Sequence, residues 1–197
     1  MKLKQLHRIS GIVIAAFLVL HLSNHLFALG GPALHITVMK YFRIVYRFPP
    51  MEVLLLLCVA FQIISGLGLV FTKGFRRLPT YVIAQVVSGI YLSLFLINHV
   101  KAVLLARYEW NVETDFYFAS GVAVRYPEKL FFIPYYTFSV LCAFTHIACA
   151  HYARRTELAT VPDAGGRFRR EAFWILGAGV VVTALIMGSF TGLFYPL

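Results

Sequence analysis

Acidic residues, cysteines and nucleotide-binding motifs are all scarce in this chain. Of its 197 residues only 8 are Asp or Glu, against 18 Lys or Arg, and charged residues of either sign make up 13%. The three cysteines lack any spacing suited to zinc or an iron–sulfur cluster and are interpreted as small apolar residues. There is no P-loop, glycine-rich dinucleotide fingerprint, Ser-His-Asp set or HExxH motif. Chemistry on a soluble substrate is therefore expected to belong to another subunit.

Hydrophobic residues are abundant instead, at 60% of the chain. A helix needs about 20 apolar residues to cross a hydrocarbon core about 30 Å thick. Because a backbone in lipid must satisfy its own hydrogen bonds, apolar stretches of this length are expected to be helical. The sequence thus predicts an all-α integral membrane bundle, with residues 1–197 as one domain and five membrane-spanning helices. The predicted helices lie near 8–30, 51–72, 79–107, 130–154 and 172–194.

The basic residues are distributed unequally between the two sides of these predicted helices. One side carries eleven of the 18 Lys and Arg, and the other carries six, partly offset by five acidic residues. By the positive-inside rule, the N-terminus is expected in the cytoplasm and the C-terminus outside. This pattern argues against a nucleic-acid partner and reflects either topology alone or a docking surface for a soluble partner or anionic lipid. The side with eleven basic residues, called the basic side below, comprises Lys2, Lys4, Arg8, Lys73, Arg76, Arg77, Arg154, Arg155, Arg167, Arg169 and Arg170.

Two of the predicted helices repeat one pattern. SGIVIAAFLVLH ends at His21 and SGIYLSLFLINH ends at His99, with each histidine ten residues after the glycine. A histidine inside an apolar helix is costly and usually functional. Both histidines lie about 12–14 Å from the outer ends of their helices, and each shares a face with its serine, where a small residue lets a flat macrocycle approach. The repeat predicts one haem iron held between His21 and His99. The alternative is two unrelated histidines bonded to neighbouring helices.

Other polar residues in the predicted helices leave alternatives open. His25 lies one turn beyond the first repeat histidine, so it ligates the iron in that histidine's place, meets a propionate, a quinone or water, or is a polar interfacial residue with no special role. Gln62 at mid-depth in the second stretch and His146 in the fourth either share an interhelical hydrogen bond or flank a second haem. His35 is expected in an outer loop and His151 at the membrane interface, neither with a specific role.

The start of the first predicted helix is a candidate quinone site. His7 and Arg8 open this helix and Ser10 follows. A guanidinium beside a histidine and a hydroxyl at the membrane surface suits the carbonyl oxygens of a quinone. The same residues also suit a positive-inside anchor with a helix cap. If a quinone binds on the outer side instead, Glu52 is a candidate proton group.

In these features the chain resembles the cytochrome b membrane anchor of succinate dehydrogenase and fumarate reductase, in its single-polypeptide, five-helix class. The resemblance covers roughly 7–152 and rests on FLVLHLSNHLFAL, PPMEVLLLLCVAFQIISGL and SGIYLSLFLINHV. It implies an outer haem between His21 and His99 and an inner haem between Gln62 and His146. Members with two haems have a histidine where this chain has Gln62.

The same resemblance implies a function. It implies a haem b-binding subunit in the bacterial inner membrane, with one haem b or two, that passes electrons between a cytoplasmic flavoprotein and iron–sulfur unit and a membrane quinone. The HRxSG string is similar to the quinone-site entry of the related two-polypeptide anchors and maps to His7, Arg8 and Ser10. Two alternatives use the same helices: a standalone haem b quinol or ferric reductase anchor, and a haem-free structural subunit of a larger membrane complex.

Overall fold

The computed structural model describes residues 3–73, 78–160 and 165–197, and these are helical with no strand. Lys2, Arg76 and Arg77, which belong to the predicted basic side, lie outside the described residues, and for Lys73 only the backbone is described. The elements are α1 (Leu3–Leu26), the 3₁₀ turn η1 (Phe27–Gly30), α2 (Pro32–Tyr46), α3 (Pro49–Lys73), α4 (Thr80–Tyr108), α5 (Phe116–Val124), α6 (Lys129–Leu158) and α7 (Arg167–Phe190).

Five helices among the described residues are long and apolar enough to cross a membrane. They are α1 continued by η1, α3, α4, α6 and α7, and each bound falls within five residues of the predicted one. The predicted all-α fold with five helices of membrane-spanning length is thereby confirmed. Helix α7 is shifted at both ends, since it begins at Arg167 and ends at Phe190, before the turn at Gly192 with its φ of 75°.

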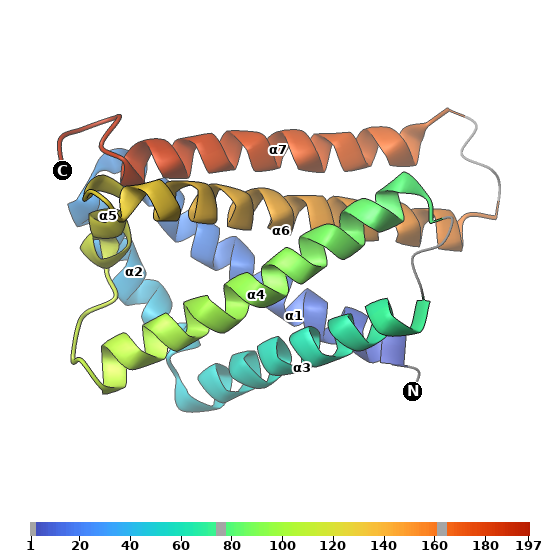
Figure 1. Cartoon of the computed structure of the whole chain (residues 1–197), viewed down its shortest axis with the longest axis horizontal. Coiled ribbons are helices and arrows are strands. Elements are labelled where there is room, and N and C mark those ends of the chain that lie inside the picture. The colour runs from blue at the N-terminus through green and yellow to red at the C-terminus, as the bar shows by residue number, and fades with distance from the viewer. Residues whose placement is uncertain (1–2, 74–77, 161–164) are drawn as a thin grey trace.

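The long helices alternate in direction, so the bundle has two distinct ends (Figure 1). The N-terminal end contains the starts of α1, α4 and α7 and the ends of α3 and α6. The opposite end, called the α2 end below, contains α2, α5 and the C-terminus. The described members of the predicted basic side all belong to the N-terminal end, so the charge pattern of the sequence corresponds to a real polarity of the fold.

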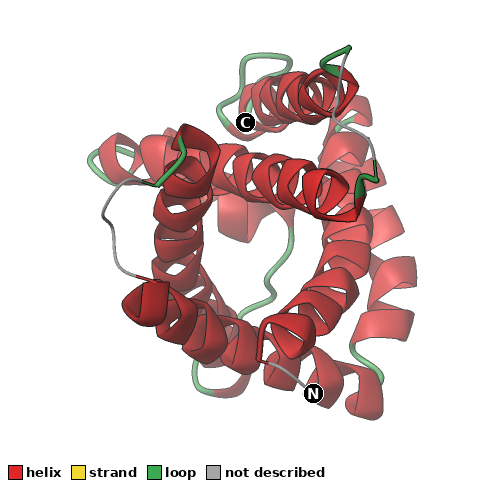
Figure 2. Cartoon of the chain, turned by 90° about the vertical axis from the view of Figure 1, so that its right-hand side faces the viewer, coloured by secondary structure: helices red, strands yellow, loops and turns green. Residues whose placement is uncertain are grey.

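Four of the long helices form a ring, which Figure 2 shows from the N-terminal end. In this ring α1 packs against α3, α3 against α4, and α4 against α6, while α7 packs on the outside of α6. Helices α1 and α4 therefore occupy opposite positions and do not pack against one another along their length. Side chains that extend inward from α1 and α4 meet across the middle of the ring.

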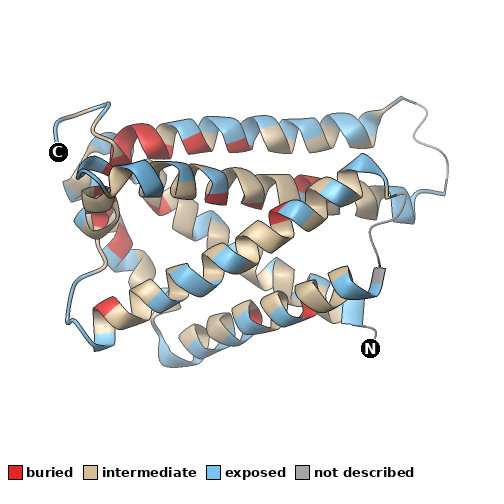
Figure 3. Cartoon of the chain, in the orientation of Figure 1, coloured by how far each residue is buried: buried red, intermediate tan, exposed pale blue. Residues whose placement is uncertain are grey.

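The closest packing lies between α6 and α7 and at the α2 end. A Cβ on Gly179 of α7 would lie 2.5 Å from Cβ of Phe144, so only glycine allows this approach of α7 to α6. At the α2 end a hydrophobic core joins η1, α5 and α7, where Figure 3 shows the buried residues of α7 concentrated. Its buried members are Ala28, Phe116, Ala123, Ile186 and Phe190.

Helices α2 and α5 replace segments that the sequence analysis interpreted as outer loops. Helix α2 begins after Gly31, whose φ of 96° is easily adopted only by glycine, with Pro32 at its first position. Helix α5 is capped by Asp115, whose carboxylate accepts from the backbone N–H groups of Tyr117 at 2.9 Å and Phe118 at 3.3 Å. These two helices close the α2 end of the ring and add polar side chains to it.

Candidate functional site

The two repeat histidines meet inside the ring. The rings of His21 on α1 and His99 on α4 have centroids 6.0 Å apart, with their planes at 74°. Each ring also stacks on a phenylalanine one turn earlier on its own helix, Phe17 at 5.4 Å and Phe95 at 5.2 Å. The phenylalanine is thus a further part of the repeat, at the same spacing in both helices, and it fixes the direction of each imidazole.

The spacing of this pair suits ligation of one metal from both sides. Two metal–imidazole bonds of about 2 Å on opposite sides of one ion place the ring centroids about 6 Å apart. His21 and His99 lie deep within the molecule, yet each keeps part of its surface accessible. Both come from helices that face each other across the ring. By residue type and centroid spacing, the pair matches the axial ligand set of a haem b, which is two imidazoles.

A chain of imidazoles continues from His21 to α2. His25 Nε2 lies 3.3 Å from His21 Nε2, and His25 Nδ1 lies 3.1 Å from Nε2 of His35. Asn24 Nδ2 donates to the same His35 nitrogen at 3.0 Å, so this nitrogen is an acceptor and His35 carries its proton on Nδ1. The Nδ1 of His35 and the Oδ1 of Asn24 are buried without a partner among the described residues.

The prediction that His35 is a solvated loop residue is wrong. His35 lies in α2 and is 2% exposed, with its ring stacked on His25 at 5.3 Å and edge-on to Phe116 at 5.4 Å. Burial lowers the pKa of His35 to about 4; the carboxylate of Asp115 opposes this shift and the guanidinium of Arg43 adds to it. His35 is therefore a neutral hydrogen-bonding residue that fixes His25.

This network bears on the role of His25. A nitrogen that coordinates iron cannot also share a hydrogen bond, so ligation through Nε2 of His21 releases His25 Nε2. The released nitrogen would be available to a propionate, a quinone or water, as the sequence analysis expects for His25. The ring of His25 also lies edge-on to Phe190 at 5.1 Å, so it is held by contacts that do not depend on His21.

The two residues of the second predicted ligand pair bond to different helices. Gln62 donates through Nε2 to the carbonyl of His7 and, at 2.8 Å, to Ser10 Oγ, both on α1. His146 Nδ1 donates instead to the carbonyl of Gln85 on α4, at 2.9 Å. Among the contacts of the described residues there is none between Gln62 and His146. Gln62 therefore bonds to α1 and His146 bonds to α4, which in each case is the neighbouring helix in the ring.

Each Ser-Gly pair in the long helices receives a polar side chain from a neighbouring helix. The contacts, measured from an ideal Cβ on the glycine, are Gly11 with Gln62 at 3.2 Å, Gly66 with His7 at 3.3 Å and Gly89 with His146 at 3.0 Å. The glycines thus make room for a side chain, whereas the sequence analysis assigned this room to a macrocycle. The third pair, Ser65-Gly66, is visible in the sequence and is the signal that could have located the partner of His7.

The candidate quinone residues are only partly brought together. His7 Nδ1 and Ser65 Oγ are 2.7 Å apart, and Ser65 is 3% exposed. With Ser10 and Gln62 they form a polar group between α1 and α3, toward the N-terminal end of the bundle, called the His7 cluster below. Arg8, by contrast, is exposed on the outer surface of α1.

Charged side chains at both ends of the bundle form ion pairs. At the α2 end Glu52, the candidate proton group, pairs with Arg107. At the N-terminal end His151 Nε2 lies 2.9 Å from a carboxylate oxygen of Glu171, so this predicted interfacial histidine links α6 to α7. Glu171 also pairs with Arg167 at 3.0 Å. Carboxylates therefore neutralise part of the basic charge at the N-terminal end.

No protein family model matches this chain, and no curated protein or solved structure is significantly similar to it. Within the described residues there is also no group of three or more His, Cys, Asp or Glu side chains arranged to hold a metal ion. Among the described residues, His21 and His99 are a pair of imidazoles that two helices on opposite sides of the ring bring together.

Proposed function

We propose that the chain is the haem b-binding membrane anchor of a succinate:quinone oxidoreductase-type complex in the bacterial inner membrane. The observation that carries the proposal is the approach of His21 and His99 to 6.0 Å from opposite positions in the helix ring. When bound, haem b supplies a one-electron carrier whose potential is set by its axial ligands and its burial. His21 and His99 act as those ligands.

Other residues hold this pair in place. Phe17 and Phe95 fix the two imidazoles by stacking. His25 turns its released nitrogen toward a haem substituent or quinone. One haem b is proposed rather than two, since Gln62 and His146 are bonded to different helices and an amide oxygen ligates haem iron poorly.

The N-terminal end is proposed as the partner side. Exposed Arg8, Arg169 and Arg170 suit an acidic docking surface on a cytoplasmic flavoprotein and iron–sulfur unit. The His7 cluster lies at the same end and offers an imidazole and hydroxyls to the carbonyl oxygens of a quinone. In this proposal electrons pass between the docked unit and a quinone near the cytoplasmic interface, with the haem, which lies nearer the α2 end, as a reservoir. If electrons instead cross to a quinone on the outer side, the haem is the relay.

The test is a haem-to-protein ratio and an absorption spectrum for the purified protein. We expect about one haem b per chain with a low-spin bis-imidazole spectrum, which His99→Ala abolishes and the matched control His151→Ala preserves. A wild-type protein without haem would favour a haem-free structural subunit. Haem without co-purifying flavin and iron–sulfur subunits would favour a standalone quinol or ferric reductase anchor.

A further inference from the structure

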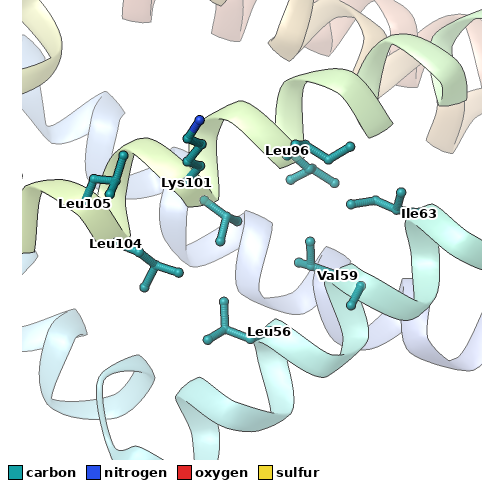
Figure 4. Close-up of a pocket in the computed structure, with 10 residues that line it drawn as sticks. Leu56, Val59, Ile63, Leu96, Lys101, Leu104 and Leu105 are labelled. Atoms are coloured by element: carbon teal, nitrogen blue, oxygen red, sulfur yellow. The ribbon is translucent and has the colours of Figure 1, made fainter. Parts of the chain in front are cut away.

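A groove runs between α3 and α4 on the surface of the bundle (Figure 4). Its volume is about 420 Å³, within the range of small-molecule sites, and nine of its ten lining residues are apolar. Leu56 and Ile63 of α3 face Leu96 and Leu104 of α4 across it. The tenth lining residue is Lys101.

The groove opens to the outside of the ring, away from the candidate haem site. Ile97 lines the groove and is 49% exposed. His99 is two residues further along, which places it about 200° around α4 from Ile97. A ligand in the groove therefore lies against the lipid-facing side of α4 and does not contact the histidine pair.

Lys101 is an unusual residue for this surface. It is exposed on a membrane-spanning helix and forms no hydrogen bond or ion pair with any described residue. Charged side chains in such helices are normally paired or turned inward. Lys101 lies seven residues before the end of α4 at Tyr108, about 10 Å along the helix, so a side chain extended toward that end would bring its ammonium group nearer to the polar level of the bilayer. Figure 4 shows its ammonium group at the edge of the groove, pointing away from the leucines.

We propose that this groove binds an anionic phospholipid of the leaflet at the α2 end. One acyl chain lies along the apolar walls between α3 and α4, and the phosphate group meets the ammonium group of Lys101. The charge of the groove favours an anionic ligand, because its lining residues include one cation and no carboxylate. A neutral quinone would gain a hydrogen bond from the ammonium group but no attraction between net charges, and a zwitterionic phospholipid would gain less than an anionic one. The proposal does not depend on haem binding.

Lipid binding by the full-length protein in detergent tests this proposal, with phosphatidylglycerol and phosphatidylcholine titrated separately and adducts counted by native mass spectrometry. We expect phosphatidylglycerol to bind about fivefold more tightly, the effect of one lysine near an anionic lipid. Lys101→Gln should remove this preference and Lys101→Arg should keep it. Ala60→Phe, which fills the groove from the α3 side, should weaken binding of both lipids.

Lys40→Gln is the matched control, since it removes an exposed positive charge from the α2 end outside the groove. It should leave the preference intact, and the helix content of every variant is checked by circular dichroism. Equal binding of both lipids by the wild type would overturn the proposal. So would an equal loss of preference in Lys40→Gln and Lys101→Gln, or unchanged binding in Ala60→Phe.

Discussion

At the residue scale, His21 and His25 are the two candidates on α1 for one ligand position. Only His21 approaches His99, at 6.0 Å, whereas His25 contacts His21, His35 and Phe190. We therefore expect His21→Leu to lose the bound haem and His25→Leu to retain most of it. The pyridine haemochrome assay on equal amounts of folded protein measures both. Haem loss in His25→Leu together with retention in His21→Leu would exchange the two assignments.

The buried His35 makes the folded state sensitive to acid. Its pKa is about 4 in the folded state against 6.5 for an ordinary histidine, so the unfolded chain takes up a proton first as the pH falls. Stability is complete above pH 6.5 and is lost as the pH falls toward 4. Lowering the pH from about 7.5 to about 5 should reduce the Tm by about 4–8 °C through this residue.

His35→Gln isolates this contribution from that of the other histidines. The variant keeps a polar group beside Asn24 but cannot titrate, so its Tm should fall less with pH than that of the wild type. Differential scanning calorimetry in detergent at both pH values gives the comparison. Equal pH dependence in the two proteins would mean that His35 is not the acid-sensitive residue.

Single residues also show how far the sequence could be interpreted. The approach of His21 to His99 could be predicted because a repeat marks both residues, and Phe17 and Phe95 stand at equal positions in the same repeat. His35 could not be assigned to this site from the sequence. It belongs to a different helix, and its burial follows from α2 folding back against α1, which no local pattern encodes.

At the element scale, the packing of α7 on α6 depends on one of two neighbouring glycines. A Cβ on Gly179 would lie 2.5 Å from Phe144, whereas one on Gly177 would have no atom within 4 Å. Gly179→Ala should therefore destabilise the protein by about 1–3 kcal/mol through overpacking. Gly177→Ala should stabilise it by up to about 1 kcal/mol, because alanine favours a helix more than glycine does. Thermal unfolding of the two variants provides the measurement, and equal Tm values would contradict this account of the α6–α7 contact.

The five long helices could be predicted because lipid imposes length and hydrophobicity on each of them separately. Helices α2 and α5 were not predicted, since at 15 and 9 residues they are too short to give the membrane-spanning signal. Their start signals are nevertheless present in the sequence, with Gly31-Pro32 before α2 and Asp115 before α5. The register of α6 against α7 was beyond prediction, because it depends on side-chain contacts such as that of Phe144 with Gly179.

At the scale of the whole molecule, the polarity of charge along the bundle has consequences for topology. The N-terminal end carries most of the Lys and Arg, and the α2 end balances six basic residues with five acidic ones. Glu109, just after α4, is exposed at the α2 end, and Ala159, just after α6, is exposed at the N-terminal end. The three native cysteines lie within the membrane-spanning helices, so they add little background to labelling from water.

These two positions allow the orientation to be measured on the full chain. By the positive-inside rule, Glu109→Cys should react with a membrane-impermeant maleimide on intact cells, whereas Ala159→Cys should react only after the membrane is opened. The wild-type protein provides the background of the native cysteines. The reverse pattern would place the basic end outside, and a cytoplasmic flavoprotein and iron–sulfur unit could not then dock on it. Labelling at Ala159→Cys in intact cells would thus reject the partner side of the proposed function while leaving the His21–His99 haem site untouched.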